Sequence, residues 1–433
     1  MEISPELQYL SAKRTAMANP ATKYDDLYYS RLNSTMALIQ SQSVIGKWRQ
    51  NLSSKEFGSS STIILPRGNF LGTCFLHLKL PALTASGQSL SRGHLYSAIR
   101  EISYQVGSSN VNTITISGKS IYHLFMAQGN TSEQMEELLE MGGRGVIYDP
   151  AKPETHEPIE GDVIIPLPWS TFNGGQYQKL PFDTAMLSQP IQVTITFQEL
   201  KNIYGGAHPG TVGFDEAFFY MREEVLVNKE LGMAALLKRP ENMDMISAYP
   251  YVHTQLWQSP NFAGSAPGNE PTILTLQGFL NSDLFGIVLS LHLAEDESNP
   301  GGNRPCQPWR SVEAYNLRVE YNGETVYYAP GESYRIHNMA SIMGNPAINM
   351  FDYVQATPVT AQPYISRCIF VDFSRIRCAS FHNHWPNTPK FPNEVLNVYL
   401  NTPDSGNYRL YATYLYPGII ETKSDGQVEI YFS

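Results

Sequence analysis

An internal repeat constrains the fold of this chain more than any single motif does. The segment STIILPRGNFLGTCFLHLKLPAL, residues 61–83, is echoed by PTILTLQGFLNSDLFGIVLSLHLA, residues 271–294. Each copy reads as a short strand, a break that contains glycine, and an alternating strand that ends in Leu-His-Leu. The copies lie about 210 residues apart, which indicates that the chain contains a duplicated domain.

The same register continues through two further landmarks. AIREISYQVGSS at 98–109 matches VEAYNLRVEYNGE at 312–324, and both run from an alternating strand into a Gly or Asn-Gly hairpin turn. GKSIYHLFM at 118–126 matches GESYRIHNM at 331–339, with Gly, Ser and Met recurring 213 residues apart. Three pairs of matching segments therefore share nearly the same offset, which is not expected of chance similarity.

The repeat then becomes weaker, and its offset shrinks to about 200 residues. QPIQVTITF at 189–197 resembles PNEVLNVYL at 392–400, and FFYMREEVLV at 218–227 resembles YRLYATYLYPGII at 408–420. Loops of unequal length account for the change in offset. Each copy spans about 170 residues and about eight short strands, which predicts tandem β-sandwiches.

Composition agrees with a β-rich chain of two large domains. Only 16% of the 433 residues are charged. The chain contains 32 glycines, 29 prolines, 26 tyrosines and 19 phenylalanines, a composition typical of many strands joined by turns. The net charge of −10 argues against general or sequence-specific binding of nucleic acid, although a basic patch within the first sixty residues stays possible.

The repeat sets the predicted domain boundaries. They are an N-terminal arm at 1–59, a first sandwich at 60–230, a connector at 231–255 and a second sandwich at 256–433. The arm lacks strand alternation, and the connector region carries a short helix broken by Pro240. Another short helix is predicted at 131–143. The N-terminus lacks the pattern of a secretory signal, so we expect the chain to fold inside a cell.

No metal site or cofactor site is predicted. The four cysteines form no CxxC pair, and their spacing fits neither a zinc knuckle nor a disulfide scaffold. Four residues are close enough in the sequence to be considered as metal ligands, namely Cys368, Cys378, His382 and His384. The gaps between them match no common metal site.

Three patterns that suggest catalysis also fail. ISGKS at 116–120 lacks the earlier glycine of a phosphate loop, because position 113 is Thr. HNHW at 382–385 contains the letters of the HNH nuclease motif, but the residues of that motif are spread over tens of positions, so this segment is too compact to form it. A cupin site would need a Glu soon after His382-Asn-His384, and the next one is Glu394. We therefore predict no catalytic residue and no enzymatic activity.

The order of the motifs resembles the double-jelly-roll major capsid proteins, the hexon-like proteins of large DNA viruses, virophages, polinton-like viruses and tailless phages with internal membranes. IPLPW and LPFDTAMLSQPIQVTITF carry it in the first half, and FVDFSRIRCASF at 370–381 carries it in the second. Phe373-Ser-Arg-Ile376 is the most family-like tetrapeptide, and the resemblance covers about residues 60–433. It implies a mainly β fold of two tandem eight-stranded antiparallel jelly rolls with short helices and an N-terminal arm.

The resemblance also implies a role in a virion. Three copies would form a pseudo-hexagonal capsomer that tiles an icosahedral shell around a double-stranded DNA genome, after assembly in the host cell. The expected partners are further copies of the chain, neighbouring capsomers, and penton and minor capsid proteins reached through the arm. Within the arm, Trp48 either anchors a protein contact or covers the underside of the first sandwich. An internal membrane is a further possible partner. The polar stretch at 170–179 would be a loop between strands.

A tandem jelly-roll glycan-binding protein is the alternative interpretation. The aromatic content of 12% favours it, including Trp169, Trp257, Trp309 and Trp385. The missing secretory signal argues against it.

Overall fold

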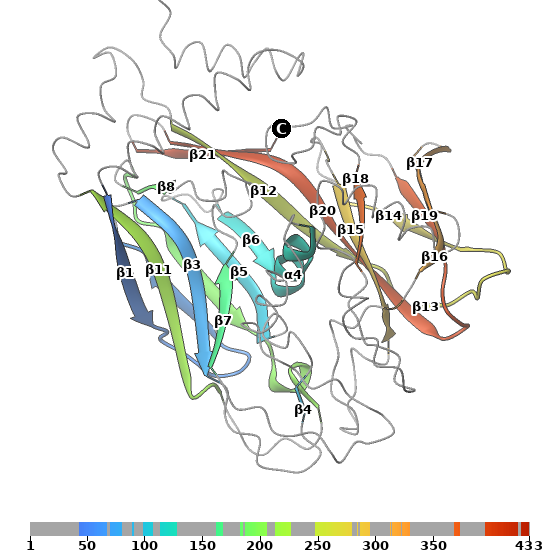
Figure 1. Cartoon of the computed structure of the whole chain (residues 1–433), viewed down its shortest axis with the longest axis horizontal. Coiled ribbons are helices and arrows are strands. Elements are labelled where there is room, and N and C mark those ends of the chain that lie inside the picture. The colour runs from blue at the N-terminus through green and yellow to red at the C-terminus, as the bar shows by residue number, and fades with distance from the viewer. Residues whose placement is uncertain are drawn as a thin grey trace, which may run out of the picture.

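The computed structural model contains two β-sandwiches, the first at the left and the second at the right of Figure 1. The residues that it describes are 43–66, 70–79, 89–90, 98–106, 113–127, 162–167, 182–184, 187–205, 213–226, 247–278, 284, 286–294, 312, 314–321, 323–329, 368–372, 395–422 and 426–432. All statements below concern these residues.

The first sandwich packs a five-stranded sheet A against a four-stranded sheet B, and every pairing in them is antiparallel. Sheet A has the order β1-β11-β3-β7, with β8 also paired to β3, and sheet B has the order β2-β9-β5-β6. The strands are β1 (Ser43–Asn51), β2 (Ser60–Ile64), β3 (Phe70–Lys79), β5 (Ile99–Gln105), β6 (Thr113–Ser117), β7 (Asp162–Leu167), β8 (Phe182–Asp183), β9 (Gln192–Phe197) and β11 (Glu216–Leu226). Helix α4 (Gly118–Ala127), a 3-10 turn η3 (Leu200–Asn202) and a small sheet of β4 (Ser89–Leu90) with β10 (Tyr204–Gly205) complete this half.

The second sandwich repeats this plan with a six-stranded sheet A′ and a four-stranded sheet B′. Sheet A′ has the order β12-β20-β15-β18, with β13 and β21 also paired to β20, and sheet B′ has the order β14-β19-β16-β17. The strands are β12 (Ser247–Gln258), β13 (Phe262–Ala263), β14 (Thr272–Leu276), β15 (Gly286–Leu293), β16 (Tyr315–Tyr321), β17 (Glu324–Ala329), β18 (Cys368–Asp372), β19 (Leu396–Asn401), β20 (Asn407–Thr422) and β21 (Val428–Phe432).

The two sandwiches correspond strand by strand, which confirms the repeat predicted from sequence. Sheet A maps onto sheet A′ as β1 to β12, β11 to β20, β3 to β15 and β7 to β18, and sheet B maps onto B′ as β2 to β14, β9 to β19, β5 to β16 and β6 to β17. Both copies of Leu-His-Leu lie at the end of the equivalent strands β3 and β15. The predicted Asn-Gly hairpin joins β16 to β17, where Gly323 has a φ of 79°.

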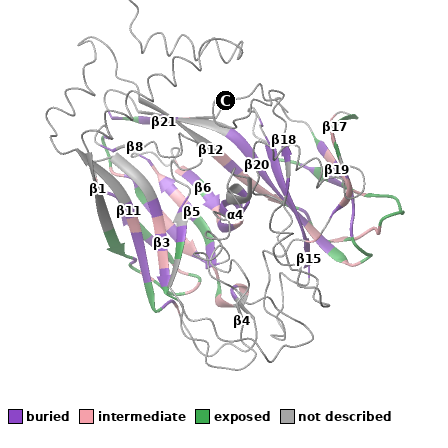
Figure 2. Ribbon diagram, viewed as in Figure 1, coloured by how far each residue is buried: buried purple, intermediate pink, exposed green. Residues whose placement is uncertain are grey.

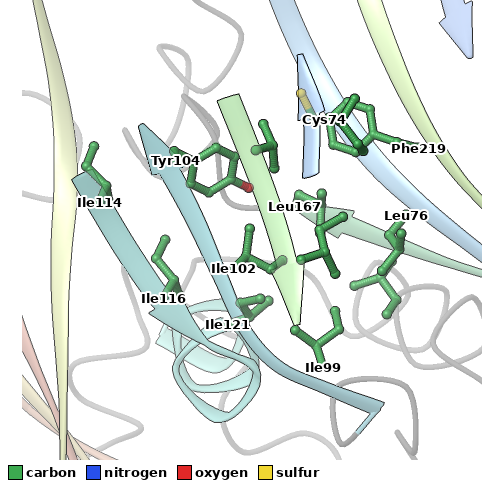
Figure 3. Packing of buried hydrophobic residues seen from close by; sticks show 14 of the residues in the cluster. Cys74, Leu76, Ile99, Ile102, Tyr104, Ile114, Ile116, Ile121, Leu167 and Phe219 are labelled. Carbon is green, nitrogen blue, oxygen red and sulfur yellow. The ribbon is translucent and has the colours of Figure 1, made fainter. Parts of the chain in front are cut away.

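Alternation of apolar and polar residues places one face of each strand in a core. In β9, Val193, Ile195 and Phe197 are buried, as their spacing predicts, while Gln192 is exposed. Figure 3 shows the first core, in which Cys74 and Phe219 of sheet A face the side chain of Tyr104 from sheet B. Figure 2 shows the same division along β3, where buried and partly exposed residues alternate from Cys74 to Leu78.

Two of the predicted boundaries are wrong. Residues 43–51 belong to sheet A instead of an arm, because all nine of them pair with β11, and Leu52 is buried after them. Residues 247–255 belong to sheet A′ instead of a connector, because β12 pairs along β20. Both are outer strands of their sheet paths, where cross-strand hydrogen bonds hold a strand whose sequence lacks strict alternation.

Several predicted features lie outside the described residues. They are the short helix predicted around Pro240 in the connector region, the short helix predicted at 131–143, the loop at 170–179, and the segment 331–339 that matches α4 in the repeat. The strand counts of the described sheets, nine in the first sandwich and ten in the second, exceed the eight predicted for each. No helix among the described residues is long and apolar enough to cross a membrane.

A close backbone approach in the second sandwich gives a direct test of the packing. A Cβ atom added at Gly264 would lie 2.3 Å from Thr402 Oγ1 and 2.5 Å from the Asp404 carbonyl oxygen. We expect Gly264→Ala to lower the free energy of unfolding by about 2–3 kcal/mol, the upper part of the usual range for overpacking. The measurement is urea denaturation.

The matched control is Gly268→Ala, where φ is +99° and no atom lies within 4 Å of the added Cβ. Its cost is expected to be smaller, about 1 kcal/mol, because only backbone strain opposes it. Equal costs for the two variants would contradict the predicted steric conflict at Gly264.

Candidate functional site

The described part of the chain holds no group of three or more His, Cys, Asp or Glu side chains placed to bind a metal ion. Cys74 is buried in the first core, and burial raises the pKa of its thiol. Cys368 begins β18, where its backbone pairs with Ser290 of β15. The other three suggested ligands, Cys378, His382 and His384, lie outside the described residues, so the absence of a metal there stays a prediction.

The Gly-Lys-Ser sequence that resembles part of a phosphate loop begins helix α4. The Ser117 hydroxyl accepts a hydrogen bond of 3.0 Å from the backbone N–H of Ser120, which caps the first turn. The Lys119 ammonium lies 3.1 Å from the centre of the Tyr411 ring, across the boundary between the sandwiches. The lysine therefore contributes a contact between the two sandwiches.

The contact between the sandwiches, here called the junction, is formed where α4 and β6 meet the outer face of sheet A′. Helix α4 contacts β12, β15 and β18, and β6 contacts β12. Figure 1 shows α4 between the strands of the first sandwich and the long pair β12 and β20. The sequence of β15 explains how both of its faces are buried: Ile287, Leu289 and Leu291 join the second core, while Val288 joins the first.

A buried hydrogen-bond network crosses the junction. His123 of α4 is within 2.7 Å of Thr413 Oγ1 through Nδ1 and within 2.9 Å of Ser290 Oγ through Nε2. The Ser290 hydroxyl is also 2.9 Å from His292 Nε2. All four side chains are buried. Because a buried polar group is costly without hydrogen bonds, this network favours one relative orientation of the two sandwiches.

Burial determines the charge state of the central histidine. It lowers the pKa of His123 from 6.5 to about 3, and the nearby Lys119 ammonium contributes in the same direction. His123 is therefore neutral at neutral pH, so one ring nitrogen donates a hydrogen bond and the other accepts one. A backbone hydrogen bond of 3.0 Å from Ser188 N–H to the Gly426 carbonyl adds a second link between the sandwiches.

The face of sheet A that corresponds to the junction is more open. Phe75, His77 and Tyr220 are partly exposed there, and Ile164 of β7 is 39% exposed. The Arg49 guanidinium carbon lies 3.5 Å from the centre of the Phe218 ring, which it partly covers. Aromatic side chains therefore line this position of the first sandwich, where Phe218 is buried and Phe75 and Tyr220 are half-buried.

The outer faces of sheets B and B′ differ in chemistry although they are equivalent in the fold. One row of paired residues across sheet B consists of small hydroxyl side chains: Thr62, Thr194, Ser103 and Thr115. The equivalent row across sheet B′ is apolar, aromatic and basic: Ile273, Tyr399, Arg318 and Tyr328. In that row the Arg318 guanidinium carbon lies 4.2 Å from the centre of the Tyr399 ring.

The described polar groups divide between the buried junction and the outer faces of the sheets. His123 and Cys74, whose pKa values are shifted by burial, lie in packing contacts, whereas the hydroxyl row of sheet B and the aromatic row of sheet B′ lie on outer faces. Sequence reasoning pointed to the GKSIYHLFM segment and to Leu-His-Leu as repeat landmarks, but it did not identify the network of His123, Ser290 and Thr413. In the sequence, the network is marked only by polar residues inside otherwise apolar periodic segments. That pattern does not indicate which segments will contact each other.

Comparison with known proteins identifies this fold. No family model matches the sequence, and no curated protein matches it. A chain of the PBCV-1 virus capsid matches with a TM-score of 0.61 and 9% identity, covering 90% of this chain and 97% of that one. A chain of the Sputnik virophage matches with a TM-score of 0.58 and 11% identity, covering 90% and 89%. The mavirus major capsid protein matches with a TM-score of 0.51 and 14% identity, covering 90% of each chain. The chain thus has the double-jelly-roll fold, which confirms the predicted fold class.

Proposed function

We propose that this chain is the major capsid protein of a double-stranded DNA virus. The observation that carries the proposal is the fold, which is shared over nine tenths of the chain with a chain of the PBCV-1 virus capsid and with the mavirus major capsid protein. The buried junction also supports it, because a hydrogen-bonded contact between the two sandwiches suits a subunit that keeps one shape during assembly.

Two equivalent sandwiches in one chain allow a trimer to form the repeating block of an icosahedral capsid. Three copies around a threefold axis place six similar sandwiches in a ring, which is a pseudo-hexagonal block able to tile an icosahedral surface. The junction would keep the two sandwiches of each copy at one fixed angle. We further propose that residues 1–42 contact neighbouring capsomers, penton or minor capsid proteins, or an internal membrane, and that the chain has its place in the virion.

The capsomer proposal predicts a homotrimer in solution. Light scattering coupled to size exclusion should give about three times the chain mass of 48.5 kDa. Negative-stain electron microscopy of the same fraction should show particles with a hexagonal outline. A stable monomer at micromolar concentration in native buffer would contradict the proposal.

Glycan binding is the second candidate, and one observation favours it. Sheet B′ carries Tyr328, which is 51% exposed, in the row that also contains Arg318 and Tyr399. Exposed aromatic rings beside polar groups can stack on sugars. Of the tryptophans that suggested a lectin, Trp257 packs against the second core, and the other three lie outside the described residues. A glycan array with a Tyr328→Ala control separates the two candidates.

A further inference from the structure

Strand β21 has no counterpart among the described strands of sheet A. In sheet A′, β15 pairs with β20 only from Tyr408 to Leu415, and β21 pairs with the next part of β20, from Gly418 to Thr422. In sheet A, β3 pairs with β11 from Glu216 to Glu224. We call residues 416–422 of β20 together with β21 the extension. Duplication of the fold does not account for it.

The apolar side chains of the extension belong to the core of the other sandwich. Ile420 and Val428 are 4% and 5% exposed, and both are members of the hydrophobic cluster of the first sandwich, against which Ile430 also packs. These three side chains share one face, because Ile420 pairs with Ile430 and Thr422 pairs with Val428. A strand whose ladder belongs to the second sandwich therefore has its apolar face in the first core.

A backbone hydrogen bond attaches the start of β21 to the first sandwich. The Ser188 N–H donates to the Gly426 carbonyl oxygen over 3.0 Å. Ser188 lies between Leu187 and Ile191, which are both buried in the first core and lead into the inner strand β9 of sheet B. In Figure 1, β21 and the end of β20 that pairs with it lie on the side of the second sandwich that is turned toward the first.

We propose that β21 completes the core of the first sandwich, so that this sandwich reaches its full stability only in a chain synthesised through residue 432. The strands of the first sandwich itself end at Leu226, some two hundred residues earlier. Folding of the first half of the chain thereby depends on its last described strand, and incomplete chains are marked by a core that is open to water. This device acts within a single chain, so it does not depend on the proposed capsid function.

Truncation separates this proposal from a local effect on sheet A′. A chain that ends at residue 422 lacks β21 but keeps all of β20. If β21 served only the sheet to which it is hydrogen-bonded, its loss would affect the second sandwich. The proposal places the effect in the first sandwich instead. The equivalent inner strands β9 and β19 are matched reporters of the two cores.

Hydrogen exchange followed by mass spectrometry reads both reporters in one experiment. In the truncated chain, the amides of β9 are expected to exchange about a hundredfold faster than in the full chain, because the apolar contacts of Val428 and Ile430 with the first core are lost. The amides of β19 are expected to change by less than about threefold, because the second core keeps its own contacts.

The thiol of Cys74 is an independent probe of the first core. It is free and fully buried in the first cluster, so iodoacetamide reaches it only when that core opens. Its labelling rate, measured on the peptide that contains it, is expected to rise in the truncated chain by about the same hundredfold factor as exchange in β9.

A single substitution in the full chain tests the same contact more mildly. Val428→Ala removes part of one buried side chain, and we expect exchange in β9 and labelling of Cys74 to become about tenfold faster. Gln427→Ala is the matched control, because Gln427 is the exposed neighbour of Val428. It should change both rates by less than about threefold.

The outcomes separate this inference from the proposed function. If the truncated chain and Val428→Ala speed exchange in β19 as much as in β9, or leave β9 and Cys74 at the rates of the full chain, the inference is overturned. If the truncated chain does not fold, the comparison of Val428→Ala with Gln427→Ala decides. The capsid proposal is tested by the oligomeric state of the full chain, and it stands or fails separately.

Discussion

A truncated chain that begins at residue 52 is expected to lose its folded first sandwich, whereas a chain that begins at residue 43 is expected to keep it. The shorter chain lacks β1, whose nine residues form a continuous ladder with β11. Backbone hydrogen bonds contribute on the order of 1 kcal/mol each, so this loss is a large part of the stability of a domain, about 5–15 kcal/mol.

The measurement is thermal melting by circular dichroism, with the chain that begins at residue 43 as the matched control. That control should melt within about 2 °C of the full chain. Because we propose that residues 1–42 contact other capsid components, the control should also assemble into trimers but give fewer complete particles by electron microscopy. Equal melting of the two truncated chains would show that β1 contributes little, and unchanged particle yield would make residues 1–42 dispensable.

Lowering the pH below 6.5 is expected to destabilise the folded chain, because His123 is buried in its neutral form at the junction. His123 has a pKa of about 3 in the folded chain and about 6.5 when unfolded, so the unfolded state binds more protons between these values. The contribution of His123 to stability is therefore complete above pH 6.5 and is lost as the pH falls toward 3. At about 1.4 kcal/mol per pH unit, the full loss is on the order of 5 kcal/mol.

Urea denaturation at several pH values measures this loss. The variant His123→Gln retains polar atoms but cannot take up a proton, so its stability should depend less steeply on pH. His253→Gln is the comparison variant, because burial also lowers the pKa of His253, to about 4, in a strand of sheet A′. A wild-type stability that stays constant from pH 6.5 to pH 4 would contradict the prediction, as would equal pH dependence in the wild type and His123→Gln.

Most of the individual strands, and the duplication that relates them, could be predicted from the sequence. Val193, Ile195 and Phe197 alternate with polar residues, and this local pattern reports one buried face of a strand without any knowledge of its partners. The repeat of Leu-His-Leu adds a global constraint, because a segment that recurs in register indicates a second domain of the same fold. Together these determined two tandem sandwiches.

The tertiary structure alone decided which segments meet. Strand β1, with the sequence SVIGKWRQN, lacks strict alternation, and it is a strand because β11 supplies its hydrogen-bond partners. His123 and Thr413 are 290 residues apart, and neither side chain carries a local sign that it will meet the other. The physical reason is that periodicity reflects the environment of one segment, whereas the junction arises only when two finished sandwiches pack together.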